Sequence, residues 1–124
     1  MLIAGQWVDS GNGQTADILN PANGEVIATT PKATLDDVER CVTASRAAFN
    51  NPEWKNIDPA QRGRILNKMA AATYANAKTL AVIESTNNGK TFREALSEIR
   101  FGAWTLEYFA GLADKNEGST IPVP

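Results

Sequence analysis

Cys41 is the only cysteine in this 124-residue sequence, and it is the first candidate for nucleophilic chemistry. A reactive cysteine needs a thiolate, which a nearby cation, a histidine or a helix N-terminus would stabilise. The sequence contains no histidine, and Cys41 falls on an apolar helical stripe with Arg40 pointing off another side. We therefore interpret Cys41 as a small buried apolar residue and not as a nucleophile.

Carboxylates in the second half of the sequence are the next candidates, because paired acids can transfer protons. Glu94 and Glu98 are four residues apart and would share a helix face, and Glu84 precedes them. Glu94, however, lies three residues after Thr91, which is the spacing of a capping box. No histidine joins these acids, so a structural or solvated role is the simpler interpretation.

The run Asn88-Gly89-Lys90-Thr91 could place a lysine and a helix N-terminus against an anion. The same residues are also what one helix needs to end and the next to begin. The sequence has neither a strand–GxGxxG–helix pattern nor GxxxxGK[ST], so no phosphate loop is indicated. We favour the structural interpretation of this turn.

Composition excludes several classes of function. The 12 basic and 14 acidic residues give a net charge of −2 without any run of like charge, which argues against nucleic acid as a partner. A single cysteine and no histidine exclude an internal disulfide, a histidine triad and a zinc site of the usual ligands. No stretch is long and apolar enough to cross a membrane, so we expect a cytoplasmic protein. The length allows one domain with one core.

The sequence pattern predicts strands followed by helices, which is an α+β segment. We expect a β-hairpin or meander over residues 1–31, with strands at 2–8, 15–19 and 25–30, the second returning along the first. The turn at 20–24 would place Gly24 in the left-handed region. Pro31 should end the last strand, because proline donates no ladder hydrogen bond.

Three helices should follow over residues 34–118. Thr34 with Asp37, and Thr91 with Glu94, have capping-box spacing, and Asp58 before Pro59 is a third N-cap signal. The second helix should run from Pro59 to the Asn88-Gly89 C-cap, and the third should run on to Gly118.

The third helix is apolar on more than one side. Phe101, Trp104 and Tyr108 lie off its main stripe, and each ring left in water forgoes roughly 1.5–3 kcal/mol of burial. The sequence also stops within a β-prone run at residues 120–124. Both features predict that further polypeptide, C-terminal to residue 124, covers these helices. An alternative is a free-standing interaction or oligomerisation module that uses this apolar face to bind partners or a second copy.

Several stretches of the sequence, taken in order, resemble motifs of the aldehyde dehydrogenase family. They are AGQWVDS at 4–10, NPANGEVI at 20–27, DV at 37–38 with RAAF at 46–49 and Trp54, PAQRGRIL at 59–66, ESTNNGK at 84–90, and YFAGLADK with GSTIPVP at 108–115 and 118–124. Each motif alone is weak, but their order over nearly the whole chain is specific. The resemblance implies the N-terminal part of that α/β fold, with helices that pack on a Rossmann-type cofactor domain.

The resemblance also implies a reaction. Family members oxidise an aldehyde to a carboxylic acid with NAD or NADP: a cysteine attacks the aldehyde, hydride passes to the nicotinamide, and a glutamate-activated water releases the acid. The residues for catalysis and for cofactor binding would lie beyond residue 124, and Cys41 does not match the catalytic cysteine motif. By resemblance, this chain is then an N-terminal segment, inactive alone, whose partners are the rest of the polypeptide, an aldehyde and further copies in an oligomer.

One site carries over by position. Many family members hold a monovalent cation between backbone carbonyls before the NP turn and an acidic side chain before NGK. The matching positions here are Ile18, Leu19 and Asn87. Oxygen ligands suit Na⁺ or K⁺. Asn87 replaces the usual aspartate, which removes one formal charge, and an uncharged polar contact at the turn is the alternative interpretation.

Overall fold

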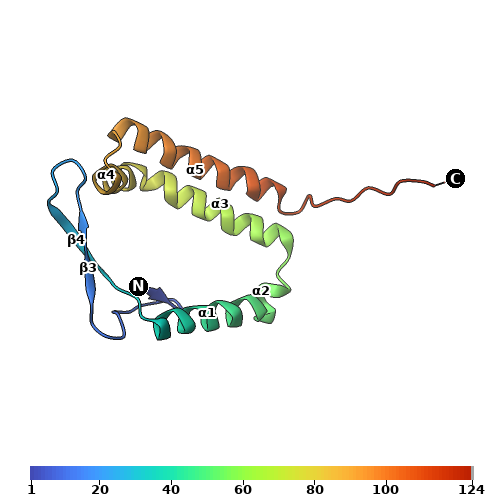
Figure 1. The fold of residues 1–124 in the computed structure, drawn as a ribbon. Coiled ribbons are helices and arrows are strands. Elements are labelled where there is room, and N and C mark those ends of the chain that lie inside the picture. The colour runs from blue at the N-terminus through green and yellow to red at the C-terminus, as the bar shows by residue number, and fades with distance from the viewer. Residues whose placement is uncertain (124) are drawn as a thin grey trace. The chain divides into compact units, whose positions relative to one another are not determined.

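The computed structural model describes residues 1–123 and divides into two compact units (Figure 1). The first unit comprises Met1–Asn56 and Glu84–Lys90, and the second comprises Ile57–Ile83 and the chain from Thr91 onward. The length permits one core, but each unit has its own set of internal contacts. No helix within residues 1–123 combines the length and apolarity that crossing a membrane would need.

The first unit begins with a small hairpin. Strand β1 (Leu2–Ile3) pairs antiparallel with β2 (Gln6–Trp7), and the Val8 amide donates to the Met1 carbonyl at 2.8 Å. Ala4 and Gly5 form the turn, and both have positive φ, at 51° and 77°. The prediction of one strand over residues 2–8 is therefore wrong, because the left-handed pair at Ala4–Gly5 reverses the chain within it.

A second hairpin follows in the same unit. Strand β3 (Thr15–Leu19) pairs antiparallel with β4 (Val26–Pro31), with an irregularity between Ile18 and Leu19. The turn between them is as predicted: Gly24 has φ of 75°, and its amide donates to the Asn20 carbonyl at 2.8 Å. The two hairpins form separate two-stranded sheets, so β3 pairs with β4 and does not return along the first strand as expected.

Helix α1 (Leu35–Asn50) begins at the predicted capping box, in which Thr34 and Asp37 bond reciprocally. A short helix α2 (Pro52–Lys55) follows, which the sequence analysis did not anticipate. It begins at Asn51, whose side chain accepts a hydrogen bond from the Glu53 amide at 3.0 Å, and Pro52 occupies its first position. The local N-cap signal was therefore present in the sequence.

The helix expected over residues 59–88 is two helices, α3 (Pro59–Ala75) and α4 (Ala77–Asn88). The predicted N-cap at Asp58 is confirmed, since its side chain accepts from the Ala60 amide at 2.8 Å. The break lies at Asn76, whose side chain donates to the Ala72 carbonyl at 2.8 Å. Asparagine competes in this way with the regular helical bonds and ends the helix locally.

Helix α5 (Phe92–Leu112) begins at the predicted Thr91–Glu94 capping box. It ends at Leu112 and does not reach Gly118 as expected. The Lys115 ammonium donates to the Gly111 carbonyl at 2.8 Å, and the Lys115 amide donates to the Leu112 carbonyl at 3.0 Å. These bonds satisfy carbonyls of the last turn and terminate the helix there.

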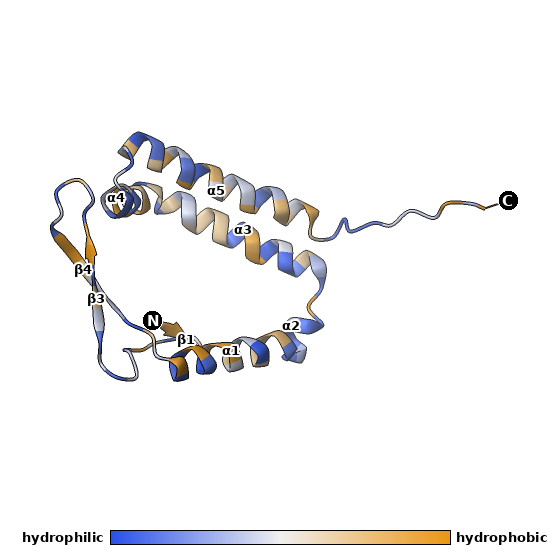
Figure 2. Cartoon of the chain, viewed as in Figure 1, coloured by the Kyte–Doolittle hydropathy of each residue, from blue (hydrophilic) through white to orange (hydrophobic). Residues whose placement is uncertain are grey.

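Helices α3 and α5 lie side by side in the second unit (Figure 1). Their contact is made by small residues: an added Cβ at Gly63 would lie 2.7 Å from the Ala110 carbonyl oxygen, and Ala70 and Ala103 are fully buried. Among residues 1–123, Ile3 is the one buried apolar side chain larger than alanine. Larger apolar side chains are instead exposed in both units. Figure 2 shows hydrophobic stretches along α1 and α5.

Candidate functional site

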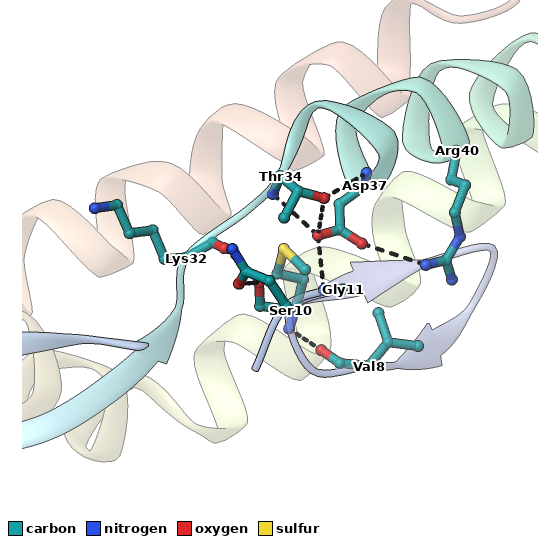
Figure 3. Close-up of polar contacts among 9 residues, drawn as sticks. Val8, Ser10, Gly11, Lys32, Thr34, Asp37 and Arg40 are labelled. Carbon is teal, nitrogen blue, oxygen red and sulfur yellow. Dashed lines mark hydrogen bonds and ion pairs between the residues drawn. The ribbon is translucent and has the colours of Figure 1, made fainter. Parts of the chain in front are cut away.

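A cluster of polar contacts in the first unit surrounds Asp37, whose side chain is only 1% exposed (Figure 3). Its carboxylate accepts hydrogen bonds from the amides of Gly11 and Thr34, both at 3.0 Å, and from the Thr34 hydroxyl at 2.8 Å. The Arg40 guanidinium lies 3.3 Å from the other carboxylate oxygen. One buried acid therefore joins the start of α1 to a loop 26 residues earlier.

These contacts fix the charge of Asp37. The amide donors of Gly11 and Thr34 and the Thr34 hydroxyl lower the pKa of Asp37 from 3.8 to about 2, with a smaller contribution from Arg40, while burial opposes the shift. At neutral pH the group is an ionised carboxylate with its oxygens occupied by donors. It is not available to accept a substrate proton, so its role is to position the chain.

Ser10 extends this cluster to the second hairpin. Its hydroxyl donates to the Lys32 carbonyl at 2.6 Å (Figure 3). The same hydroxyl lies 2.8 Å from the Asn12 side-chain oxygen. The Lys32 amide donates to the Gln14 carbonyl at 2.8 Å, so the bonds continue into the β3–β4 ladder. The spacing of Thr34 and Asp37 predicted their capping box, which the structure confirms. The contributions of Gly11 and Ser10 were not predicted, because the turn residues around them carry no signal that links them to α1.

The residues matched to a cation site all lie in the first unit. Ile18 and Leu19 stand at the irregular step of β3, and Asn87 is an exposed residue near the end of α4. The turn after Leu19 approaches the residues after Asn87, because an added Cβ at Gly89 would lie 2.9 Å from Pro21 Cγ. The register irregularity between Ile18 and Leu19 interrupts the regular ladder at this step. Within residues 1–123 no three His, Cys, Asp or Glu side chains gather as metal ligands.

Cys41 is exposed, so its interpretation as a buried apolar residue is wrong. Most of the apolar stripe of α1 on which it lies is exposed, including Val42 and Phe49 beside it. Burial of that stripe would require a packing partner, which the helical period alone does not supply. Open grooves flank Cys41 on both sides, one lined by Val42, Arg46 and Phe49 and the other by Leu2, Gly5 and Ala48.

Glu84 and Glu94 have the structural roles expected of them. Glu94 accepts from the Thr91 hydroxyl at 2.8 Å and completes the α5 cap. Glu84 forms an ion pair with Lys90 at 3.0 Å, across the turn between α4 and α5. The Ser85 hydroxyl donates to the Lys90 carbonyl at 2.7 Å and holds the same turn. Lys90 is thus engaged by the preceding helix.

Comparison with known proteins places these features in a family. The family model described as "Aldehyde dehydrogenase family" matches residues 7–124. Among curated proteins, the chain is 39% identical over 124 residues to the cytosolic 10-formyltetrahydrofolate dehydrogenase of Xenopus tropicalis, covering 99% of this chain and 14% of that protein. It is 40% identical over 121 residues to an aldehyde dehydrogenase of Emericella nidulans, covering 98% of this chain and 24% of that protein.

Among solved structures, a point mutant of betaine aldehyde dehydrogenase from Staphylococcus aureus in complex with NAD⁺ is similar, with a TM-score of 0.92 and 38% identity. The match covers 99% of this chain and 25% of that one, so the chain spans a quarter or less of these relatives. Two short hairpins followed by helices are the N-terminal part of their fold. With the family model matching nearly its whole length, this chain belongs to the aldehyde dehydrogenase family.

Proposed function

We propose that this chain is the N-terminal portion of an enzyme that oxidises an aldehyde to a carboxylic acid with NAD⁺ or NADP⁺, and that it is inactive alone. The observation that carries the proposal is the family match over residues 7–124, combined with relatives of which the chain spans only 14–25%. The remaining polypeptide would supply the nucleophile, the general base and the groups that hold the cofactor.

The side chains on hand support a scaffolding role. Asp37 is ionised and occupied by amide donors, and the acids Glu84 and Glu94 are used by a turn and a cap. Cys41 is exposed on α1 and does not match the catalytic cysteine motif of the family. The proposal includes an aldehyde as substrate, an oligomer of the complete enzyme and a cytoplasmic location. NAD⁺ is the first cofactor to test, because the Staphylococcus aureus relative was solved with it.

A chimera tests this function. The 124 residues would replace the matching segment of the Staphylococcus aureus betaine aldehyde dehydrogenase, and the chain alone would serve as its counterpart. Reduction of NAD⁺ or NADP⁺ would be followed by absorbance with a panel of aldehydes. We expect turnover by the chimera and none by the chain alone. Turnover by the pure 124-residue chain, or a folded chimera without activity, would contradict the proposal.

We also propose that Ile18, Leu19 and Asn87 contribute to a monovalent cation site. Ile18 and Leu19 would offer backbone carbonyl oxygens, and Asn87 would offer its side-chain amide oxygen. A Na⁺ or K⁺ ion bound by these oxygens would hold the turn after Leu19 against the end of α4. The contact between Gly89 and Pro21 supports this pairing of segments.

The cation site is testable by thermal unfolding of the chimera in NaCl, KCl and choline chloride at one ionic strength. We expect Na⁺ or K⁺ to raise the melting temperature relative to choline, and Asn87→Asp to enlarge the difference because it adds a charge to the site. Asn67→Asp, at an exposed position of α3, is the matched control. If the chimera and its Asn87→Asp variant each had the same melting temperature in all three salts, the proposed cation site would be refuted.

A further inference from the structure

Three asparagines of this chain are each followed by glycine, and an Asn-Gly pair is a place where a protein can modify itself without an enzyme. The pairs are Asn12-Gly13, Asn23-Gly24 and Asn88-Gly89, and all three asparagines are exposed. Asparagine is one of the thermolabile residues of proteins. Glycine leaves its backbone nitrogen open to reaction, because it has no Cβ beside it. Each pair is therefore a candidate for loss of the side-chain amide.

The reaction needs water and no other reactant. The backbone nitrogen of the glycine attacks Cγ of the asparagine, and negative charge develops on Oδ1 of a tetrahedral intermediate. The bond from Cγ to Nδ2 then breaks, and Nδ2 leaves as ammonia with the proton that the glycine nitrogen has lost, so that a cyclic imide remains. Water adds to either carbonyl of the imide and gives aspartate or isoaspartate, which has one more methylene in the main chain. A hydrogen-bond donor at Oδ1 therefore speeds the first step, and a carboxylate beside the reacting amide slows it.

The three pairs share their backbone features. In each, the asparagine Oδ1 accepts a hydrogen bond from the amide two residues later, at 3.0, 3.1 and 3.0 Å in chain order. In each, the glycine amide donates to a backbone carbonyl, at 2.9, 2.8 and 2.9 Å in the same order. The glycines have nearly the same φ, at 71°, 75° and 81°. These features therefore do not distinguish the three pairs.

The surroundings of the side-chain amide do distinguish them. At Asn23 the Nδ2 group donates to the Glu25 carboxylate at 2.8 Å, and at Asn88 it donates to the Glu84 carboxylate at 2.7 Å. Within residues 1–123, the Nδ2 group of Asn12 donates to no carboxylate. A carboxylate at such a distance repels the negative charge of the intermediate and keeps the leaving nitrogen in place as a donor. Two of the three pairs are thus protected by an acid.

Asn12 instead has a second donor at its side-chain oxygen. The Ser10 hydroxyl lies 2.8 Å from Oδ1, in addition to the Gln14 amide. Ser10 is 8% exposed, and its bond with the Lys32 carbonyl at 2.6 Å fixes the hydroxyl in place (Figure 3). The single hydroxyl hydrogen moves toward Oδ1 as charge develops there, since an ionised acceptor forms the stronger hydrogen bond. Two donors then converge on the oxygen that becomes negative, as in an oxyanion hole.

We propose that Asn12-Gly13 is the site of deamidation in this chain, ahead of the other two Asn-Gly pairs, and that the Ser10 hydroxyl promotes the reaction. The reaction requires neither a cofactor nor a longer polypeptide, so it is independent of the proposed function.

The modification changes the connection between the β3–β4 hairpin and α1. Ser10 and Gly11 make that connection through Lys32 and Asp37, and an isoaspartate at position 12 lengthens the main chain directly beside it. The Gly11 amide should therefore exchange faster in chain enriched in isoaspartate than in the Asn12→Asp variant, which has the new charge without the added methylene. Equal exchange in the two proteins would overturn this consequence.

The rates at the three pairs are compared within one sample. The folded 124-residue chain is kept at neutral pH, and fragmentation mass spectrometry follows asparagine, aspartate and isoaspartate at each position over time. We expect Asn12 to convert about tenfold faster than Asn23 and Asn88, which is the rate equivalent of one more hydrogen bond to a charged group. The same measurement in urea removes the folded contacts and should bring the three rates together. Equal rates in the folded chain, or a difference that persists in urea, would overturn the proposal.

Two substitutions separate the causes. Ser10→Ala removes the second donor and should slow conversion at Asn12 by a similar factor, whereas a hydroxyl that only held the loop would let the rate rise on its removal. Glu25→Gln removes the carboxylate beside Asn23, leaves the surroundings of Asn12 unchanged, and should speed conversion at Asn23 alone. Circular dichroism checks that both variants remain folded. A faster or unchanged rate at Asn12 in the first variant, or an unchanged rate at Asn23 in the second, would contradict the proposal.

Discussion

The two units of this chain are stabilised in different ways. In the first unit, the most enclosed side chain is a charged one, Asp37, which ties Gly11 and Thr34 to α1 through hydrogen bonds. In the second, α3 and α5 approach closely because Gly63 and buried alanines such as Ala103 leave no side chain between them. The first unit therefore depends on an ionisation state, whereas the second depends on steric fit.

The largest expected loss of stability comes from a substitution in the second unit. Gly63→Leu places a side chain where even a Cβ would lie 2.7 Å from the Ala110 carbonyl oxygen, so α3 and α5 must separate. Overpacking of this kind costs about 1–3 kcal/mol, and a leucine against backbone falls at the upper end. Urea unfolding of the 124-residue chain followed by circular dichroism measures it. Gly118→Leu, where nothing lies within 4 Å of an added Cβ, is the control. Equal stability of the two variants would refute the close helix contact.

The corresponding change in the first unit is Asp37→Asn, which keeps the side-chain size and removes the charge. The amides of Gly11 and Thr34 lose an ionised acceptor, and the new amide group brings donors to a site already filled with donors. We expect faster amide exchange at the start of α1 and in residues 10–12, with exchange in α3 and α5 unchanged. Asp36→Asn, on the exposed neighbour, is the matched control. Equal exchange changes in both units would show that the effect of Asp37 is not confined to the first unit.

Acid should reproduce the effect of that substitution. The pKa of Asp37 is about 2 in the folded chain and 3.8 without its donors, so the folded state favours the ionised form. The resulting stabilisation is complete above about pH 4 and is lost as the pH falls toward 2. We expect the wild-type chain to lose stability over this interval more steeply than Asp37→Asn, in urea titrations at a series of pH values. Parallel pH profiles would show that Asp37 is not the responsible group.

The features predicted correctly from the sequence are those encoded within a few residues. The caps at Thr34, Asp58 and Thr91 each depend on a side chain and an amide two or three residues later, and all three form. The turn with Gly24 is equally local. The helical period was also informative, because the apolar residues predicted to lie off the main stripe of α5 are exposed as expected.

The features that were missed depend on residues far apart or on an unusual conformation. The bond from the Gly11 amide to Asp37 spans 26 residues, and no spacing rule connects a glycine turn to a particular acid. Cys41 lies on a helical stripe that periodicity marks as buried, but periodicity identifies a face without showing that anything covers it. The cation residues Ile18, Leu19 and Asn87 remain a prediction.

A smaller loss of stability is expected in the first unit, where the turn at Gly89 lies against the turn at Pro21. Gly89 has φ of 81°, and an added Cβ would lie 2.9 Å from Pro21 Cγ, so Gly89→Ala combines backbone strain with a contact that must shift. A non-glycine residue in this conformation costs about 1–2 kcal/mol. Gly13→Ala shares the backbone conformation, with φ of 71°, but has open space around it, and should lose less. Thermal unfolding of both variants isolates the contact with Pro21, and equal losses would show that the contact contributes nothing.

The smallest expected effect is a gain, and it lies in the first hairpin. Ala4 has φ of 51°, a conformation that alanine adopts at a cost and that asparagine tolerates, and it precedes Gly5 in the turn from β1 to β2. Ala4→Asn creates the Asn-Gly pair that such turns favour and should stabilise the chain by less than about 1 kcal/mol. Ala22→Asn, an alanine of the other hairpin turn without positive φ, should give no gain. The substitution relieves backbone strain only in the first unit. Amide exchange should therefore slow around Val8 and remain unchanged in α3 and α5. Slower exchange in α3 and α5 as well would show that the stabilisation is not confined to the first unit.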